Sequence, residues 1–139
     1  MIEISKIYFT LGNKVEKNEE VEKELGLKKN SIKKLTGINK RYLANKNQSS
    51  ETLALKVCKK IKPHEAKKIT HIISVTNTPS IRFPGISNYV SSSLNIENVL
   101  CINLNSGCTG YVDALILAYN FISNDNKSKI LIVTTDTYS

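Results

Sequence analysis

The sequence predicts an α/β domain built on a largely parallel sheet. Three short apolar segments, residues 71–76, 99–104 and 129–134, are typical of buried strands. Segments with helical character separate them, and parallel strands need such crossover connections. The chain has 139 residues, of which 40% are hydrophobic, which is enough for one globular core. We therefore expect residues 1–139 to form a single domain.

The first third of the chain predicts a strand and two short helices. Imperfectly alternating apolar residues indicate a first strand: Ile2, Ile4, Ile7, Phe9 and Leu11. Asn18 is expected to cap a short acidic helix that ends at Gly26. Residues 28–35 predict one or two further helical turns before the Thr36-Gly37 break.

Three longer helices are predicted in the rest of the chain. Ser49 or Ser50 is expected to cap one that stops before Pro63 and carries apolar residues at a spacing of four: Leu53, Val57 and Ile61. Residues 84–93, opened by a proline, predict the second. Residues 111–121 are apolar nearly all round, as expected of a central buried helix.

The charge balance bears on the kind of partner. The formal charge is +8 at pH 7, and lysines cluster in pairs: Lys28-Lys29, Lys33-Lys34, Lys59-Lys60 and Lys67-Lys68. A solvated surface explains each pair singly, whereas the summed field attracts an acidic partner. Nucleic acid is the competing partner, but few aromatic residues lie among the basic ones and no nucleic-acid motif is present. We therefore expect no nucleic-acid binding.

Other classes of protein are disfavoured by what the sequence lacks. No stretch of about 18 apolar residues predicts a membrane-spanning helix, and Met1-Ile2-Glu3-Ile4 lacks the features of a signal peptide. Three cysteines without close pairing disfavour a disulfide scaffold. Neither Cys-x-x-Cys nor His-x-x-x-His occurs, so no zinc site is expected. The expectation is a cytoplasmic protein with no metal, no cofactor and no membrane partner.

Cys108 is the most informative residue of the chain. It lies where an apolar strand meets a small-residue turn and a long apolar helix begins. Unpaired N–H groups and the dipole at a helix N-terminus favour the thiolate, which is the nucleophilic form. Gly107 and Gly110 allow close approach of backbone and substrate. Cys108 is thus a candidate nucleophile for acyl transfer; the alternative is a space-filling thiol, as we expect for Cys58 and Cys101.

Residues 103–111, Asn-Leu-Asn-Ser-Gly-Cys-Thr-Gly-Tyr, resemble the active-site segment of β-ketoacyl-acyl carrier protein synthase III. Four further segments resemble landmarks of that family in the same order: residues 36–41, residues 72–79, Phe83-Pro84 and residues 130–136. The resemblance covers nearly the whole chain. It implies one N-terminal thiolase-like half, with a mostly parallel mixed sheet, helices on both faces and a buried central helix after Cys108.

The resemblance also implies a reaction. In the family, the cysteine takes an acyl group from a thioester and the acyl-cysteine condenses with a malonyl thioester, in fatty-acid or related biosynthesis. The N–H of Cys108 is then expected to help hold the oxyanion. The catalytic histidine and asparagine lie in a second half, and His64 and His71 match neither. We therefore expect the chain to be incompetent alone, or to be a non-catalytic or truncated half that acts with a separate C-terminal half.

The partners implied by the resemblance are acyl and malonyl thioesters of acyl carrier protein or coenzyme A, a second copy of the chain, and the missing C-terminal half. Acyl carrier protein is acidic, which agrees with the sign of the charge. Phe83 is expected to reach across a homodimer interface into the partner's acyl pocket; the alternative is an ordinary core aromatic. Ser31 and Leu35 stand where well-known members carry a tryptophan and an arginine that grip coenzyme A, so coenzyme A recognition is expected to differ.

Overall fold

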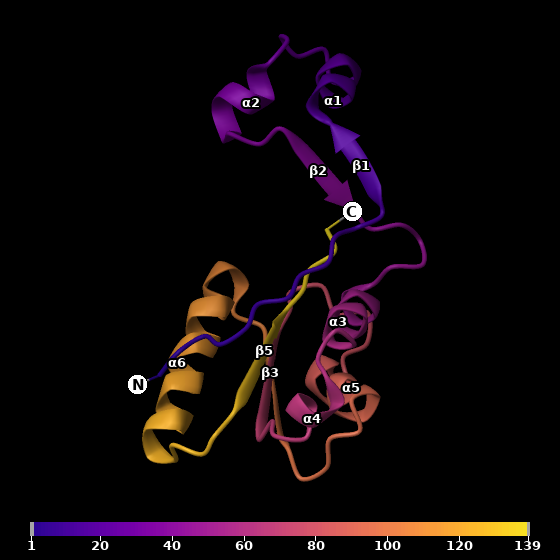
Figure 1. Cartoon of the computed structure of the whole chain (residues 1–139). Coiled ribbons are helices and arrows are strands. Elements are labelled where there is room, and N and C mark those ends of the chain that lie inside the picture. Colours follow the sequence, from indigo (N-terminus) through magenta and orange to yellow (C-terminus); the bar gives the residue numbers. More distant parts are fainter. Residues whose placement is uncertain (1, 139) are drawn as a thin grey trace.

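A three-stranded parallel sheet forms the centre of the computed structural model, which describes residues 2–138. The strands are β3 (His71–Val75), β4 (Leu100–Leu104) and β5 (Ile130–Thr134), in the order β4-β3-β5. Strands β3 and β5 are labelled in Figure 1. In the central strand, His71 lies opposite Leu100 on one side and Ile130 on the other. All three strands agree with the predicted segments to within one residue, and their parallel direction is confirmed.

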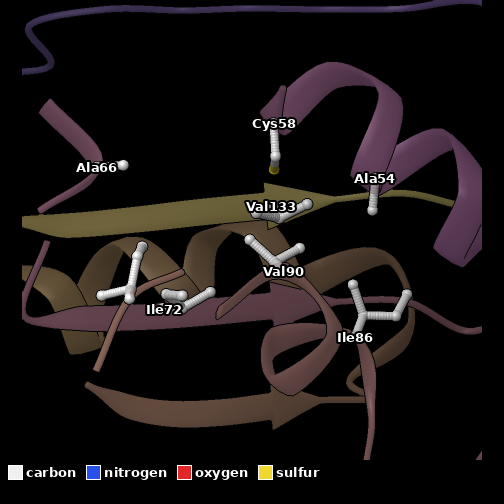
Figure 2. Packing of buried hydrophobic residues seen from close by; sticks show 8 residues of the cluster. Ala54, Cys58, Ala66, Ile72, Ile86, Val90 and Val133 are labelled. Carbon is white, nitrogen blue, oxygen red and sulfur yellow. The ribbon is translucent and has the colours of Figure 1, made fainter. Parts of the chain in front are cut away.

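Helices cover both faces of this sheet. Helices α3 (Ser50–Cys58), α4 (Pro63–Ala66) and α5 (Ile86–Ser93) lie on one face, and α6 (Gly110–Asn124) lies on the other (Figure 1). Successive side chains of a strand point to opposite faces, so Ile72 and Ile73 enter different cores. Figure 2 shows the larger core, in which Cys58 of α3 points toward Val133 of β5. This arrangement confirms the predicted α/β fold.

The starts of α3 and α5 follow from local chemistry. Ser49 caps α3 as predicted, because its side chain accepts a hydrogen bond from the Thr52 N–H while the Thr52 hydroxyl accepts one from the Ser49 N–H. Helix α3 ends at Cys58, three residues earlier than expected, and Pro63 begins α4. Helix α5 begins after Gly85, whose φ of 97° delays the helix expected from residue 84.

A projecting arm, residues 13–44, extends from the sheet domain (Figure 1). Strands β1 (Lys14–Lys17) and β2 (Lys40–Leu43) pair antiparallel, and α1 (Asn18–Glu24) and α2 (Ser31–Thr36) lie between them in the chain. The sequence did not predict this hairpin, because its two strands are short and rich in charge. Alternation is therefore too weak to reveal them.

Glutamate and asparagine side chains stabilise the arm. The Glu22 carboxylate accepts hydrogen bonds from the N–H groups of Asn30 and Ile32, each at 2.9 Å, at the start of α2. Asn18 is the first residue of α1 instead of its predicted cap, and its side chain donates to the Ile38 carbonyl across the arm. Asn18 therefore does not cap the helix; its side chain connects α1 to the chain that follows α2.

The predicted first strand is wrong. Residues 2–11 form no helix or strand, and among residues 2–138 no strand pairs with them. Ile7 and Phe9 are 80% and 71% exposed. An open groove lined by residues 2–9, β5 and α6 separates the segment from the edge of the sheet. Alternating apolar residues supply one face of a strand, but a strand also needs a neighbour at hydrogen-bonding distance.

Helix α6 occurs where the sequence predicts it, and one of its faces is buried. Gly110, Ala114 and Ala118 are buried against the sheet. Ile116 and Tyr119, on another face, are 54% and 60% exposed. The prediction of a central buried helix thus holds for one face. Among the residues described, no helix is long and apolar enough to cross a membrane.

Candidate active site

The carboxyl ends of the three parallel strands gather at one edge of the sheet. Thr76 to Thr78 follow β3, Asn105 to Cys108 follow β4, and Thr135 and Asp136 follow β5. Because the strands run parallel, these segments lie together although they are far apart in sequence. This edge is where α/β folds commonly place ligand and catalytic sites. Cys108, the nucleophile predicted from the sequence, therefore lies at the edge of the sheet where such folds commonly bind ligands.

Cys108 lies in the middle of a short 3-10 turn, Gly107–Thr109, that joins β4 to α6. Its side chain is exposed. Gly107 has a φ of 57°, a left-handed conformation that most residues adopt only with strain. The structure thus places Cys108 immediately before a 15-residue helix, as the sequence predicts.

The backbone N–H groups of this turn have different partners. The Gly107 N–H donates to the Asn77 side-chain oxygen at 3.0 Å, and the Thr109 N–H donates to the Ser106 carbonyl at 3.3 Å. The Gly110 N–H donates to the Gly107 carbonyl. Within residues 2–138, no acceptor takes the Cys108 N–H. One donor next to the thiol is therefore available to an incoming oxygen.

Gly110 sets the distance between the turn and the sheet. A Cβ atom at this position would lie 2.4 Å from Cγ1 of Val75, which is closer than two carbon atoms can approach. The first residue of α6 thus packs directly on the end of β3. Part of the expectation for the glycines is met here: Gly110 permits a close approach of helix to strand.

A polar network connects the three strand ends. Oδ1 of Asp136 accepts hydrogen bonds from the Asn77 N–H at 2.7 Å and from the Thr78 N–H at 3.1 Å. It also accepts from the Thr76 and Thr78 hydroxyls, while Oδ2 accepts from the Asn77 amide at 3.3 Å. Asn77 in turn holds the Gly107 N–H. Sequence reasoning missed Asn77 and Asp136 as site residues; the available signal was that each closely follows a buried strand.

The other two cysteines have structural surroundings. Cys58 is 2% exposed within the larger core, and burial raises the pKa of its thiol to about 11. Cys101 is half-buried in β4. The space-filling interpretation is therefore confirmed for Cys58.

The histidines lie away from Cys108. His71 opens β3 at the amino end of the sheet, and its ring packs against Phe121 with centroids 4.3 Å apart. His64 is on α4, shortly before that strand. The structure brings neither to the carboxyl edge where Cys108 lies, in agreement with the expectation that neither is the catalytic base.

Phe83 and the two arm residues are at the surface. Phe83 lies on the loop between β3 and α5 and is 88% exposed, so it is not part of the core that the described residues form. Ser31 and Leu35 are on α2 in the projecting arm, and Leu35 is 86% exposed. Within residues 2–138, none of the three residues forms a hydrogen bond with the turn that carries Cys108.

Glu51 anchors the loop that leads to Phe83. Its carboxylate accepts hydrogen bonds from the Ser80 N–H at 2.8 Å, the Ile81 N–H at 3.1 Å and the Ser80 hydroxyl. Burial opposes the charge, but the hydrogen bonds outweigh it and lower the pKa of Glu51 below its usual value. The first turn of α3 is thereby fixed to the loop.

Comparison with known proteins shows which family the chain is similar to. The family model described as 3-oxoacyl-[acyl-carrier-protein (ACP)] synthase III matches residues 102–139. A β-ketoacyl-[acyl-carrier-protein] synthase III of Staphylococcus epidermidis is 30% identical over 129 residues, which cover 91% of this chain and 40% of the relative. One from Syntrophomonas wolfei is 29% identical over 133 residues, which cover 94% of this chain and 40% of the relative. The chain thus spans about 40% of the length of these relatives.

Solved structures agree with this assignment. A crystal structure of a 3-oxoacyl-(acyl-carrier-protein) synthase III superimposes with a TM-score of 0.86 at 25% identity, covering 97% of this chain and 42% of the other. A crystal structure of an HMG-CoA synthase in complex with CoA superimposes with a TM-score of 0.86 at 21% identity, covering 93% of this chain and 34% of the other. At this identity the similarity shows the fold alone. The fold is therefore that of a thiolase-like α/β half. Within that class the chain is similar to β-ketoacyl-acyl carrier protein synthase III, and its extent fits the N-terminal half of such a protein.

Proposed function

We propose that this chain is the nucleophile-bearing part of a thioester acyltransferase that condenses an acyl group with a malonyl thioester. The observation that carries the proposal is the position of Cys108, exposed at the carboxyl edge of a parallel sheet, with a backbone N–H unoccupied beside it. Its relatives are named as synthases of β-ketoacyl groups on acyl carrier protein, which gives the class of reaction.

The chemistry begins with acyl transfer to Cys108. The thiolate attacks the thioester carbonyl, a carbon–sulfur bond forms, and the carbonyl electron pair moves to oxygen. The Cys108 N–H stabilises this oxyanion. When the carbonyl re-forms, the carrier thiolate leaves and takes up a proton. Thioester exchange of this kind is nearly balanced in energy, since a thiolate replaces a thiolate.

Carbon–carbon bond formation follows. A malonyl thioester loses carbon dioxide, and the resulting carbanion attacks the carbonyl carbon of the acyl-cysteine. The bond to Cys108 breaks and its thiolate is regenerated. In the family, a histidine and an asparagine of the second half assist this step. Since neither His64 nor His71 lies at the Cys108 edge, we propose that condensation requires groups from a C-terminal half.

Acyl carrier protein is the proposed donor or acceptor of these thioesters. The formal charge of +8 suits an acidic carrier, and the relatives' names include this carrier. Coenzyme A is the alternative carrier. Leu35, at the position of a family arginine, offers no charge to a phosphate, so recognition of coenzyme A would differ from that in well-known members.

A homodimer is the proposed assembly. Phe83 is 88% exposed on the loop before α5, and a face of α6 exposes further large apolar residues: Tyr111, Val112, Ile116 and Tyr119. Monomeric proteins rarely leave extended apolar patches in water. Phe83 is proposed to enter the acyl pocket of the second copy.

A reconstitution assay tests the proposed function. The chain is mixed with acyl and malonyl thioesters of acyl carrier protein, alone and together with a separately produced C-terminal half of the Staphylococcus epidermidis relative. We expect carbon dioxide release and β-ketoacyl product only in the mixture, and none with Cys108→Ala. Robust turnover by the chain alone would show that the base has been assigned to the wrong half. Binding of the C-terminal half without turnover would favour a non-catalytic subunit.

A further inference from the structure

We propose that Asn77 and Asp136 form a positioning clamp that orients the turn carrying Cys108, so that the Cys108 N–H stays free to receive the substrate oxygen. Asn77 follows β3 and Asp136 follows β5, which is the neighbouring strand in the sheet. The turn that carries Cys108 follows β4. The clamp thus ties together all three strand ends. The inference rests on the proposed function only in taking Cys108 as the acyl acceptor.

The first half of the clamp is the Asn77 side chain. Its amide oxygen accepts the Gly107 N–H at 3.0 Å, and its amide nitrogen donates to Oδ2 of Asp136 at 3.3 Å. An amide that uses both ends in this way is fixed in one orientation, because rotating it would bring nitrogen against the N–H and oxygen against the carboxylate. The half-buried Asn77 can therefore hold the turn in a single position.

The second half is the Asp136 carboxylate. It accepts five hydrogen bonds from residues 76–78, including the Asn77 and Thr78 N–H groups at 2.7 and 3.1 Å. Asp136 is itself exposed, and all of these donors come from three consecutive residues. The backbone around Asn77 is thus held in place, and the position of its side chain is fixed with it.

The clamp matters because of which N–H groups it uses. With Gly107, Thr109 and Gly110 all donating within the protein, Cys108 alone in this turn has an unoccupied N–H among the described residues. Releasing Gly107 would let the turn rotate and would move the Cys108 N–H away from the developing oxyanion. Such a loss affects acyl transfer, which forms an oxyanion, and spares alkylation, which forms none.

The test compares two reactions at the same thiol. Cys108 of the full chain is acylated with a small acetyl thioester and, separately, alkylated with iodoacetamide, and both rates are measured by peptide mass spectrometry. In Asn77→Ala and Asp136→Ala we expect acylation to slow by about tenfold or more while alkylation changes by less than about twofold. Asp136→Asn keeps one acceptor oxygen for residues 76–78 but loses the acceptor for the Asn77 amide nitrogen, so we expect an acylation rate between those of the wild type and Asp136→Ala.

A matched control is Asn45→Ala. Asn45 also accepts a backbone N–H, that of Asn47 at 2.9 Å, but in the loop after the arm. This variant should leave both rates unchanged. Equal slowing of both reactions in Asn77→Ala, or no change in either, would overturn the proposal.

Hydrogen exchange at the Gly107 amide separates the clamp from the proposed function. It needs no substrate, and we expect exchange in Asn77→Ala to be about tenfold faster or more than in the wild type. If wild-type Cys108 accepts no acyl group, the proposed function fails and the exchange result alone decides on the clamp. Unchanged exchange at Gly107 would overturn the clamp even if acyl transfer occurs.

Discussion

Cys58 and Cys108 carry the same thiol in opposite surroundings. Cys58 is enclosed by α3, β3 and β5 side chains, whereas Cys108 is exposed on a turn before α6. The sequence could predict this difference, because Cys58 follows a helical apolar face and Cys108 follows a small-residue turn. It could not predict Asn77 and Asp136 as neighbours of the turn. Their roles depend on which strands are neighbours in the sheet. The spacing of apolar residues predicts individual strands but not their order in the sheet.

The first prediction concerns selective alkylation of the cysteines. Limited iodoacetamide at pH 8 should label Cys108 first and Cys58 last, because Cys58 is buried and its pKa of about 11 keeps it protonated. Peptide mass spectrometry of the folded protein gives the order. Cys108→Ser should remove the fastest-labelled site. Faster labelling of Cys58 or Cys101 in folded protein would contradict the assignment.

At the scale of elements, apolar runs predicted the sheet well and the chain's first part poorly. Strands β3, β4 and β5 are buried or half-buried along most of their length, so their composition alone reveals them. Strands β1 and β2 carry charged residues on an exposed arm and leave no such signal. Residues 2–11 show the reverse case, in which alternation is present but a pairing strand is not.

The second prediction concerns the connection of α3 to the loop after β3. Glu51→Gln should lower the free energy of unfolding at pH 7 by roughly 1–3 kcal/mol, because a carboxylate that accepts three hydrogen bonds is replaced. Since folding lowers the Glu51 pKa, its contribution is present above about pH 4.3 and is lost as pH falls through the folded pKa. Urea unfolding of wild type and variant at pH 7 and pH 3 measures the difference.

We expect the difference in the free energy of unfolding between wild type and Glu51→Gln to be smaller at pH 3 than at pH 7. Glu97→Gln is the control, because Glu97 is exposed and the same charge is removed. An equal difference in the free energy of unfolding at both pH values would show that the charge of Glu51 does not stabilise the loop.

At the scale of the whole molecule, the structure leaves large apolar side chains in water. Phe83, Ile7 and Tyr138 are 88%, 80% and 78% exposed, and one face of α6 is open. The sequence predicted that α6 would be buried on all sides, because nearly all its residues are apolar. Periodicity reports how much surface a helix needs to cover; it does not report which other chain or segment covers it.

The third prediction concerns self-association. Sedimentation at micromolar concentrations should show a homodimer or larger assembly, and Phe83→Ala should weaken it by about tenfold or more if this ring is buried at the interface. Leu35→Ala removes an equally exposed apolar side chain on the arm and should have no effect. A concentration-independent monomer would exclude the dimer, and dissociation by Leu35→Ala alone would place the interface on the arm.

Acyl transfer to Cys108 is the central claim, and mapping the acyl group tests it most directly. The folded protein is incubated with an acyl thioester of acyl carrier protein, and its peptides are analysed by mass spectrometry before and after neutral hydroxylamine, which cleaves thioesters. We predict one acyl group on the Cys108 peptide, removed by hydroxylamine and absent from Cys108→Ser. An acyl group on Cys58 or Cys101, or none on Cys108, would contradict the assignment.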